Sequence, residues 1–429
     1  MKTKLAFSLI LLGFVFLTDY IYFHLYLAFG DKLFVGLAYF FSITCFIFII
    51  LSNFLYKTCF SFRDPKWKIG LFIALPLLFA AFCSERLLAI NKFYFLSKNL
   101  PKKSSGNLWR PDSLFAHRGI PNAKGSYNYY IGDSIKGSIE VTFDDQGFRT
   151  VPDTLRIISD TTNLFLGCSF TFGDYILAEE GYPYRTSILL GHQFINGGAS
   201  AYGIAQMKIL LDSLLLQKKF RYVFIQMSPW NLERAMKING PSFYGYRPYP
   251  YFSEQNGAFQ LNTPAYKTNL YNSRDWRSSG YSYREKLYFT ITDGWQIEIR
   301  DFLSYNVARV KMRLGIIPRP TKNRDALERF FYDYALLECL KNETIPVFLK
   351  LSYPLEDCRD LVAFLDKKSI VIDMDEALDN EVVKTGKTFD ELFHIYHKQG
   401  ETKLYYDAHL NAYANEIIAK KIYAELKHN

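Results

Sequence analysis

The sequence predicts an α/β protein in which a parallel sheet follows three transmembrane helices. Short apolar runs of strand length alternate with longer helical patterns after about residue 160, which is typical of a parallel α/β sheet. The first hundred residues contain three apolar runs long enough to cross a bilayer, which takes about 20 residues. Hydrophobic residues form 49% and aromatic residues 17% of the 429-residue chain, enough for a large core.

The three predicted membrane spans determine where the rest of the chain lies. Basic residues precede the first run and lie between the second and third, whereas the first connection is nearly neutral. Basic loops stay in the cytoplasm, and an odd number of spans then places the remainder in the periplasm or outside the cell. The length of the first run and the two that follow argue against a cleavable signal peptide. The runs are Leu5 to about Leu27, Leu33 to about Tyr56, and Ile69 to about Ile90, within an anchor of residues 1–92.

The net charge of +9 belongs to this anchor and its linker. Residues 1–110 hold 13 Lys and Arg against 4 Asp and Glu, and the remaining residues hold 38 of each sign. A nucleic-acid-binding face on the outer domain is therefore not expected. The six cysteines show no Cys/His ligand spacing, so no metal or other cofactor is expected. Spacing leaves open whether Cys339 and Cys358 form a disulfide.

Beyond the anchor, residues 93–112 read as a juxtamembrane linker and residues 113–429 as one domain. Residues 113–150 have strand and turn character. An aromatic-rich insertion at about 238–302 interrupts the regular pattern, and its rings suit either stacking on sugars or packing. Expected strands are Leu164–Leu166, Gln193–Ile195, Tyr222–Met227, Val347–Leu351 and Ile370–Ile372. Expected helices are Ile204–Lys219, Arg324–Lys341, Glu356–Lys367 and Ala412–Lys427.

Small and polar residues gather where these strands end, which is where sites form in open α/β sheets. Ser169 follows the first strand in a Gly-Cys-Ser-Phe-Thr-Phe-Gly segment, and Gly198 follows the second. Asn231 follows the third strand, and Asp407 and His409 precede the last helix. A serine nucleophile needs a base within about 2.6–3.2 Å and a group that orients the base. Cys168 is expected to be a small buried residue that strand alternation turns away from Ser169.

These residues together resemble the SGNH (GDSL-like) hydrolase superfamily, over about residues 113–427. The first motif matches Gly167, Ser169, Thr171 and Gly173; the second matches Asn196, Gly198 and Ser200; the last matches Asp407 and His409. The Gly-Phe-Arg turn within Asp145–Thr150 is similar to one in membrane-anchored members. The resemblance implies a three-layer α/β/α, flavodoxin-like fold. It also implies a serine nucleophile at Ser169, a base at His409, an orienting Asp407, and oxyanion donors at Ser169, Gly198 and Asn231.

Two departures from the family pattern bear on activity. Cys168 stands where the first motif has Asp, and the third motif is represented only by Asn231 in "MSPWNLERA". Losing one oxyanion donor costs about 10²–10³ in rate. The expected function is a membrane-anchored serine esterase acting on small acyl esters of envelope glycans or lipid-linked saccharides. Two alternatives stay open: an O-acyltransferase working with a separate acyl-exporting membrane protein, and a non-catalytic glycan-binding or assembly subunit.

Overall fold

A computed structural model describes residues 102–104, 108–131, 134–240, 248–266, 295–351, 365, 369–399 and 402–428. All of them belong to one compact unit, Asn99–Asn429. Within these ranges no helix combines the length and the apolar character that crossing a bilayer requires. The three predicted spans lie outside the described residues.

The centre of the domain is a parallel five-stranded sheet in the order β8-β7-β9-β12-β13. The first strand of this sheet in the chain, β7, lies between β8 and β9, so the order is the flavodoxin-like one with a switch point beside β7. All five predicted strands are confirmed, with ends that shift by one or two residues. Their bounds are β7 Thr162–Leu166, β8 Gln193–Asn196, β9 Tyr222–Met227, β12 Ile345–Lys350 and β13 Ile370–Asp373.

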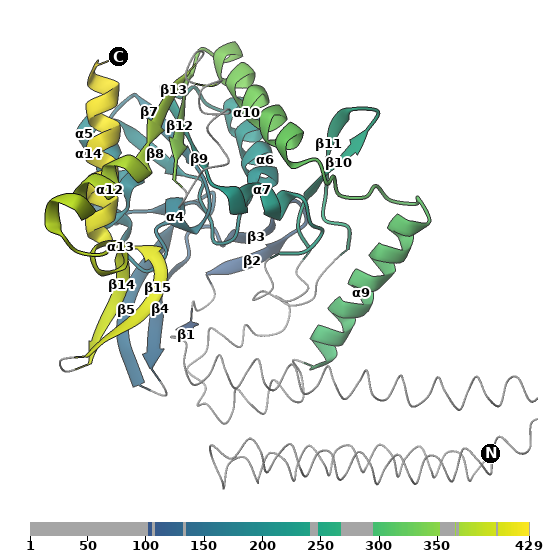
Figure 1. Ribbon diagram of the computed structural model, residues 1–429, viewed down its shortest axis with the longest axis horizontal. Helices are drawn as coiled ribbons and strands as arrows, with labels where there is room; N and C mark the ends of the chain where they lie inside the picture. Colours follow the sequence, from purple (N-terminus) through teal and green to yellow (C-terminus); the bar gives the residue numbers. More distant parts are fainter. Residues whose placement is uncertain are drawn as a thin grey trace, which may run out of the picture. The chain divides into compact units, whose positions relative to one another are not determined.

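Helices cover both faces of this sheet, giving three layers (Figure 1). One face carries α6 (Ile204–Leu215), α7 (Pro229–Ala235) and α10 (Arg324–Lys341); the other carries α5 (Tyr182–Leu190), α12 (Met374–Thr385) and α14 (Ala412–His428). Successive strand residues point to opposite faces. Leu164 and Leu166 therefore enter the first core, whereas Phe165 enters the second and stacks on Phe224 at 4.3 Å between centroids. Both faces are buried, which explains why apolar residues predominate in these strands.

Two predicted helices, those at 324–341 and 412–427, match α10 and α14 closely. The helix expected at 204–219 ends earlier, at Leu215. The helix expected at 356–367 lies outside the described residues, apart from Leu365.

An antiparallel extension at the β8 edge makes the full sheet nine-stranded and mixed, in the order β1-β4-β5-β6-β8. The predicted parallel sheet is therefore confirmed for the five central strands, whereas the full sheet is mixed. A single pair of residues, Arg149 and Asn196, joins the extension to β8. The strands are β1 Lys102–Ser104, β4 Lys124–Ile131, β5 Ser134–Phe143 and β6 Arg149–Thr150, and a separate hairpin pairs β2 Trp109–Asp112 with β3 Ala116–Gly119. β1 and β2 lie within the segment expected to be a linker.

The domain also contains hairpins and short helices outside the sheet and the helices that cover it. The predicted insertion contains a hairpin, β10 Tyr251–Gln255 with β11 Ala258–Asn262, and the start of α9, Trp295–Arg313. Its described aromatic residues Tyr249, Tyr251 and Phe252 are buried, so this part of the insertion serves packing. A second hairpin, β14 His394–Gln399 with β15 Thr402–Leu410, precedes α14. The remaining elements are α4 Ser169–Phe172, α13 Phe389–Phe393 and the 3₁₀ turns Asp153–Leu155 and Ala178–Glu180.

Candidate active site

Ser169 lies at the first position of the one-turn helix α4, directly after β7. The preceding residue, Cys168, is extended (φ −104°, ψ −150°), and Gly173 ends the turn in the left-handed region at φ +78°. A side chain at Gly167 would collide with Thr171 Oγ1, so only glycine fits there. The serine is 6% exposed and lies beside the switch point of the sheet, where ligands bind in open α/β folds.

His409 lies beside this turn, although 240 positions separate it from Ser169. It is on β15, and its ring stacks on Phe170 at 5.0 Å between centroids and packs near Tyr175 at 5.3 Å. The structure therefore brings the predicted base next to the neighbour of the predicted nucleophile. The backbone of Asp407 is on the same strand, opposite Ile395; its side chain is not among those described.

The Ser169 hydroxyl makes a long contact of 3.9 Å with the sulfur of Cys168. The expectation that Cys168 turns away from Ser169 is wrong, because Cys168 is the cap of a helix rather than a strand residue. Its sulfur also accepts hydrogen bonds of 3.3 Å from Trp230 Nε1 and from Gln226 Nε2. Burial raises the pKa of the Cys168 thiol, but nearby Arg234 and these donors outweigh it, so the pKa is lowered overall.

Gln226 is a fully buried amide that holds the turn to the centre of the sheet. Its Oε1 accepts from the Cys168 backbone N–H at 3.0 Å and from Thr171 Oγ1 at 2.8 Å, and its Nε2 donates to Ser228 Oγ at 2.8 Å. No sequence motif singled out Gln226. A lone amide within the apolar strand Tyr222–Met227 was the available signal, because a buried polar group needs partners.

Arg149 fixes the other end of the turn. It is 2% exposed, and its guanidinium donates to the backbone oxygens of Phe172, Gly173 and Ile176. The guanidinium also lies over the Phe172 ring, 4.7 Å from the centroid. The Gly-Phe-Arg turn noted in the sequence therefore supports α4 from the antiparallel side of the sheet.

Two of the three expected oxyanion donors have other partners in this structure. The Gly198 N–H donates to Asn196 Oδ1 at 3.0 Å, and a Cβ at Gly198 would press on the α4 backbone. Asn231 is fully buried; its Nδ2 donates to the Gln226 carbonyl at 3.4 Å, and its Oδ1 accepts from Arg234. Ser169 is at the first position of α4, where a backbone N–H has no acceptor within the helix.

A second buried polar cluster lies next to the α4 turn. No sequence motif predicted this cluster. Ser200 Oγ donates to Asp174 Oδ2 at 2.6 Å, and the Ser200 carbonyl is 3.0 Å from His117 Nε2. The Asp174 N–H donates to the Ser169 carbonyl at 3.0 Å. This cluster connects the second glycine-rich segment to the carbonyl side of the nucleophile turn.

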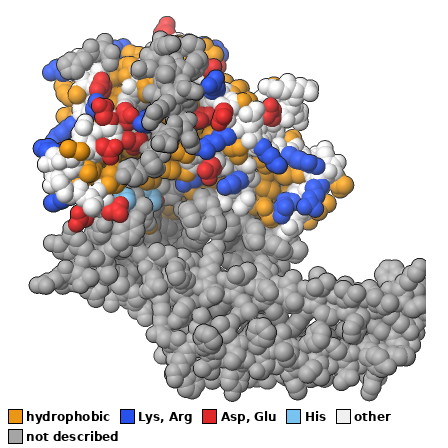
Figure 2. All heavy atoms as spheres, in the orientation of Figure 1, with side chains coloured by type: hydrophobic (Ala, Val, Ile, Leu, Met, Phe, Trp, Pro, Cys, Tyr) orange, Lys and Arg blue, Asp and Glu red, His pale blue; other side chains and the backbone are white. Residues whose placement is uncertain are grey.

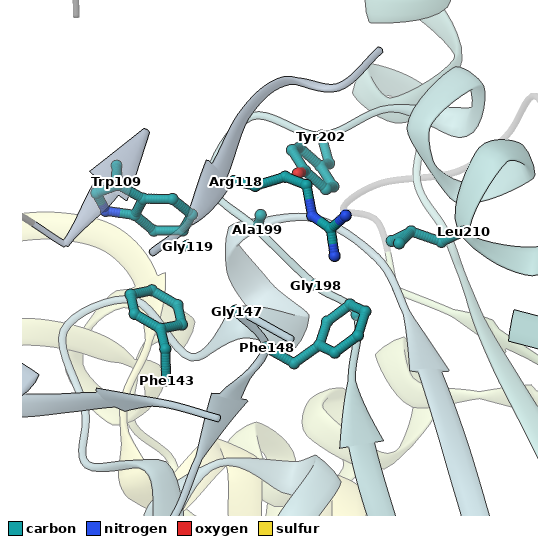
Figure 3. Close-up of a pocket in the computed structure, with 11 residues that line it drawn as sticks. Trp109, Arg118, Gly119, Phe143, Gly147, Phe148, Gly198, Ala199, Tyr202 and Leu210 are labelled. Atoms are coloured by element: carbon teal, nitrogen blue, oxygen red, sulfur yellow. The ribbon is translucent and has the colours of Figure 1, made fainter. Parts of the chain in front are cut away.

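A cavity of about 10 Å³ lies behind the Gly198 segment, lined by residues that include Trp109, Arg118, Phe143 and Phe148 (Figure 3). It holds about one water molecule. Because neither Ser169 nor His409 lines it, it is not the place for a substrate.

Comparison with known proteins identified similar solved structures only. No family model and no curated protein matches the chain. A protein from Desulfitobacterium hafniense DCB-2 assigned to the G-D-S-L lipolytic family shares 10% identity over 62% of this chain and 99% of its own, with a TM-score of 0.30. A catalytic mutant of an acetylxylan esterase from Geobacillus stearothermophilus shares 12% identity over 63% of this chain and 96% of its own, with a TM-score of 0.31.

A carbohydrate esterase family 2 enzyme with a carbohydrate-binding domain, from Corynascus thermopiles, shares 13% identity over 68% of this chain and 72% of its own, with a TM-score of 0.28. TM-scores near 0.3 are too low to carry an argument. The architecture therefore rests on the strand order and the site on its own contacts.

Proposed function

We propose that the chain is a membrane-anchored, extracytoplasmic serine hydrolase of the SGNH type. It cleaves, or transfers, small acyl esters on envelope glycans or lipid-linked saccharides. One observation carries the proposal: the His409 ring stacks on Phe170, the residue next to Ser169, at the carboxyl end of the central strand. The proposed base therefore lies against the residue next to the proposed nucleophile, at the end of the sheet where open α/β folds bind ligands.

The reaction uses the chain's own groups. Ser169 Oγ attacks the ester carbonyl carbon while His409 takes its proton, and His409 then gives that proton to the departing sugar oxygen. The acyl group stays on Ser169 until water or a sugar hydroxyl attacks it, again with His409 as base. Asp407 orients the imidazole in this scheme. The Ser169 hydroxyl has to turn from Cys168 towards His409, a change within the range seen between free and substrate-bound sites.

The oxyanion needs donors, and the Ser169 N–H is the one best placed. Gly198 would have to share its N–H between Asn196 and the substrate, and Asn231 would have to leave the Gln226 carbonyl. These occupied donors favour the second candidate, a non-catalytic glycan-binding subunit. Without two of the three donors a catalyst would be slowed by about 10²–10³ for each.

Fluorophosphonate labelling of the full chain tests the choice, with the labelled peptide identified by mass spectrometry. We expect label on Ser169 that disappears in Ser169→Ala and in His409→Ala. Ser187→Ala is the matched control, because the Ser187 hydroxyl is buried and has no hydrogen-bond partner among the described residues, so its loss should leave labelling unchanged. A folded chain that takes no label would rule out the hydrolase and favour glycan binding. Labelled chain that passes acyl groups to a sugar in preference to water would indicate a transferase.

A further inference from the structure

The helix α9 lies to one side of the three-layered core (Figure 1). One face of α9 packs against the domain. On this face, Ala308 and Met312 are buried in a small apolar cluster with Ile238 and Tyr251. This contact fixes the rotation of the helix about its axis, and therefore fixes which side chains face outwards.

The outward face is apolar. Val307 and Val310 are each 52% exposed, Leu314 is 69% exposed, and Ile316 just beyond the helix is 64% exposed. Positions 307, 310 and 314 form one row on a helix. Among the described residues, four of the fourteen exposed large hydrophobic side chains fall within these ten positions. Single exposed apolar residues are ordinary, whereas a contiguous group marks an interaction surface.

Cations flank the row. Residues 302–323 contain five Lys and Arg and no Asp or Glu, and Figure 2 shows basic and apolar side chains gathered where α9 lies. At about 100° per residue, Lys311 falls on one side of the row and Arg309 and Arg313 on the other. All three cations are exposed, and Arg309 lies over the Tyr305 ring at 5.6 Å.

The end of the helix keeps this face open. Gly315 adopts φ +73°, and the Ile316 N–H donates to the Lys311 carbonyl at 2.9 Å. Arg319 then folds back and donates to the backbone oxygens of Met312 and Arg313 at 3.0 and 3.2 Å. The turn is thus tied to the helix, and the Ile316 side chain remains 64% exposed.

We propose that this surface, formed by Val307, Val310, Leu314 and Ile316 with its flanking cations, docks onto an anionic lipid bilayer. Helix α9 as a whole is not strongly amphipathic, but the exposed apolar side chains at its end, bordered by Lys and Arg on both sides, match the part of an interfacial helix that enters a bilayer surface. The apolar side chains enter the headgroup boundary while the cations meet lipid phosphates. A nucleic acid would match the cations but leave the apolar row unpaired. The inference depends on α9 alone and does not rest on the proposed catalysis.

Photocrosslinking in the full chain tests this proposal. Leu314→p-benzoylphenylalanine and Val310→p-benzoylphenylalanine are placed in nanodiscs of phosphatidylcholine with or without phosphatidylglycerol, and adducts are identified by mass spectrometry. Controls carry the same label at Leu216 and Val383, which are 87% and 82% exposed on other helices. We expect lipid adducts at both α9 positions, more in anionic discs, and none at the controls. Lys311→Gln and Arg313→Gln, which each remove one cation, should each lower the yield about fivefold.

Any other pattern overturns the proposal. Adducts with another segment of the same chain would show that the chain itself covers this face. A crosslinked dimer would make it a contact between copies. Equal lipid adducts at α9 and the controls, equal yields in both lipid mixtures, or no adducts at all would each remove the bilayer as its partner.

Discussion

Replacing Arg149 with methionine should destabilise the domain strongly, although the two side chains have similar volumes. The guanidinium donates to three backbone oxygens at the end of α4 and has almost no contact with solvent. A hydrogen bond to a charged group contributes about 1.5–3 kcal/mol. Because the three bonds share one side chain, we take the lower end for each, which gives about 4–5 kcal/mol for Arg149→Met. Methionine fills the space but removes a charged donor from three buried carbonyls, of which only that of Gly173 keeps another donor among the described residues, the Ile176 N–H at 3.4 Å.

Thermal unfolding of the unit Asn99–Asn429 measures this effect. With an unfolding entropy of about 2.1 cal/mol/K per residue, a unit of this size loses about 1.5 °C for each kcal/mol. Arg149→Met should therefore lower Tm by about 6–8 °C. Arg149→Lys should recover only part of the loss, because the single ammonium nitrogen lacks the planar fork whose two nitrogens reach the separate carbonyls. Arg156→Met is the matched control, since Arg156 pairs with Asp153 at the surface and such pairs contribute little. A Tm for Arg149→Met within about 1.5 °C of wild type would refute the reasoning.

Three further predictions concern the same unit. Gln226→Leu removes the acceptor for Thr171 and for the Cys168 N–H, so Tm should fall by about 3–4 °C; an unchanged Tm would mean that the amide is dispensable. For Cys168→Ser, the difference in free energy of unfolding from wild type should grow as pH rises towards 9. Above pH 9 this difference, called the gap here, should be constant. The reason is that the folded-state pKa of this thiol is lowered from 9.0, and the stability from a depressed pKa is lost as pH falls through the folded value. A gap that does not vary with pH would contradict the lowered pKa. Phe165→Ala removes a fully buried ring stacked on Phe224 and should cost about 3–5 kcal/mol, measured by the same Tm scan; a cost below about 1 kcal/mol would show that the core closes over the gap.

The parallel core was predictable because its signal is local. Each of the five strands is a short apolar run, and runs buried on both faces stand out from the helices between them. The antiparallel extension was not predictable in this way. It joins the core through one residue pair, Arg149 with Asn196, and such long-range pairing leaves no periodic pattern in either segment.

The candidate site was predictable in its parts but not in its connections. Ser169 and His409 were found by motif and order, and the structure places the His409 ring against Phe170. The hydrogen bonds of Gln226 and the contact between Cys168 and Ser169 depend on side-chain direction at a strand-to-helix junction. The backbone conformation of one residue, Cys168 at the N-cap of α4, sets the direction of these side chains. Cys339 is a free, buried thiol in this structure, whereas Cys358 lies outside the described residues.

The position of Asn415 links the assembly of the site to the synthesis of α14. This residue of α14 is 1% exposed; its Oδ1 accepts from the Tyr182 N–H at 3.0 Å, and its Nδ2 donates to the Leu410 carbonyl at 3.3 Å. One amide therefore connects the helix that follows the nucleophile turn to the strand that carries His409. Asn415 follows Tyr182 by 233 residues, so a nascent chain carries the serine through more than 200 peptide bonds before the residue that connects these two elements is made. Under the proposed function, a chain that stops before Asn415 has no esterase activity. Premature termination therefore yields inactive protein rather than an unregulated esterase.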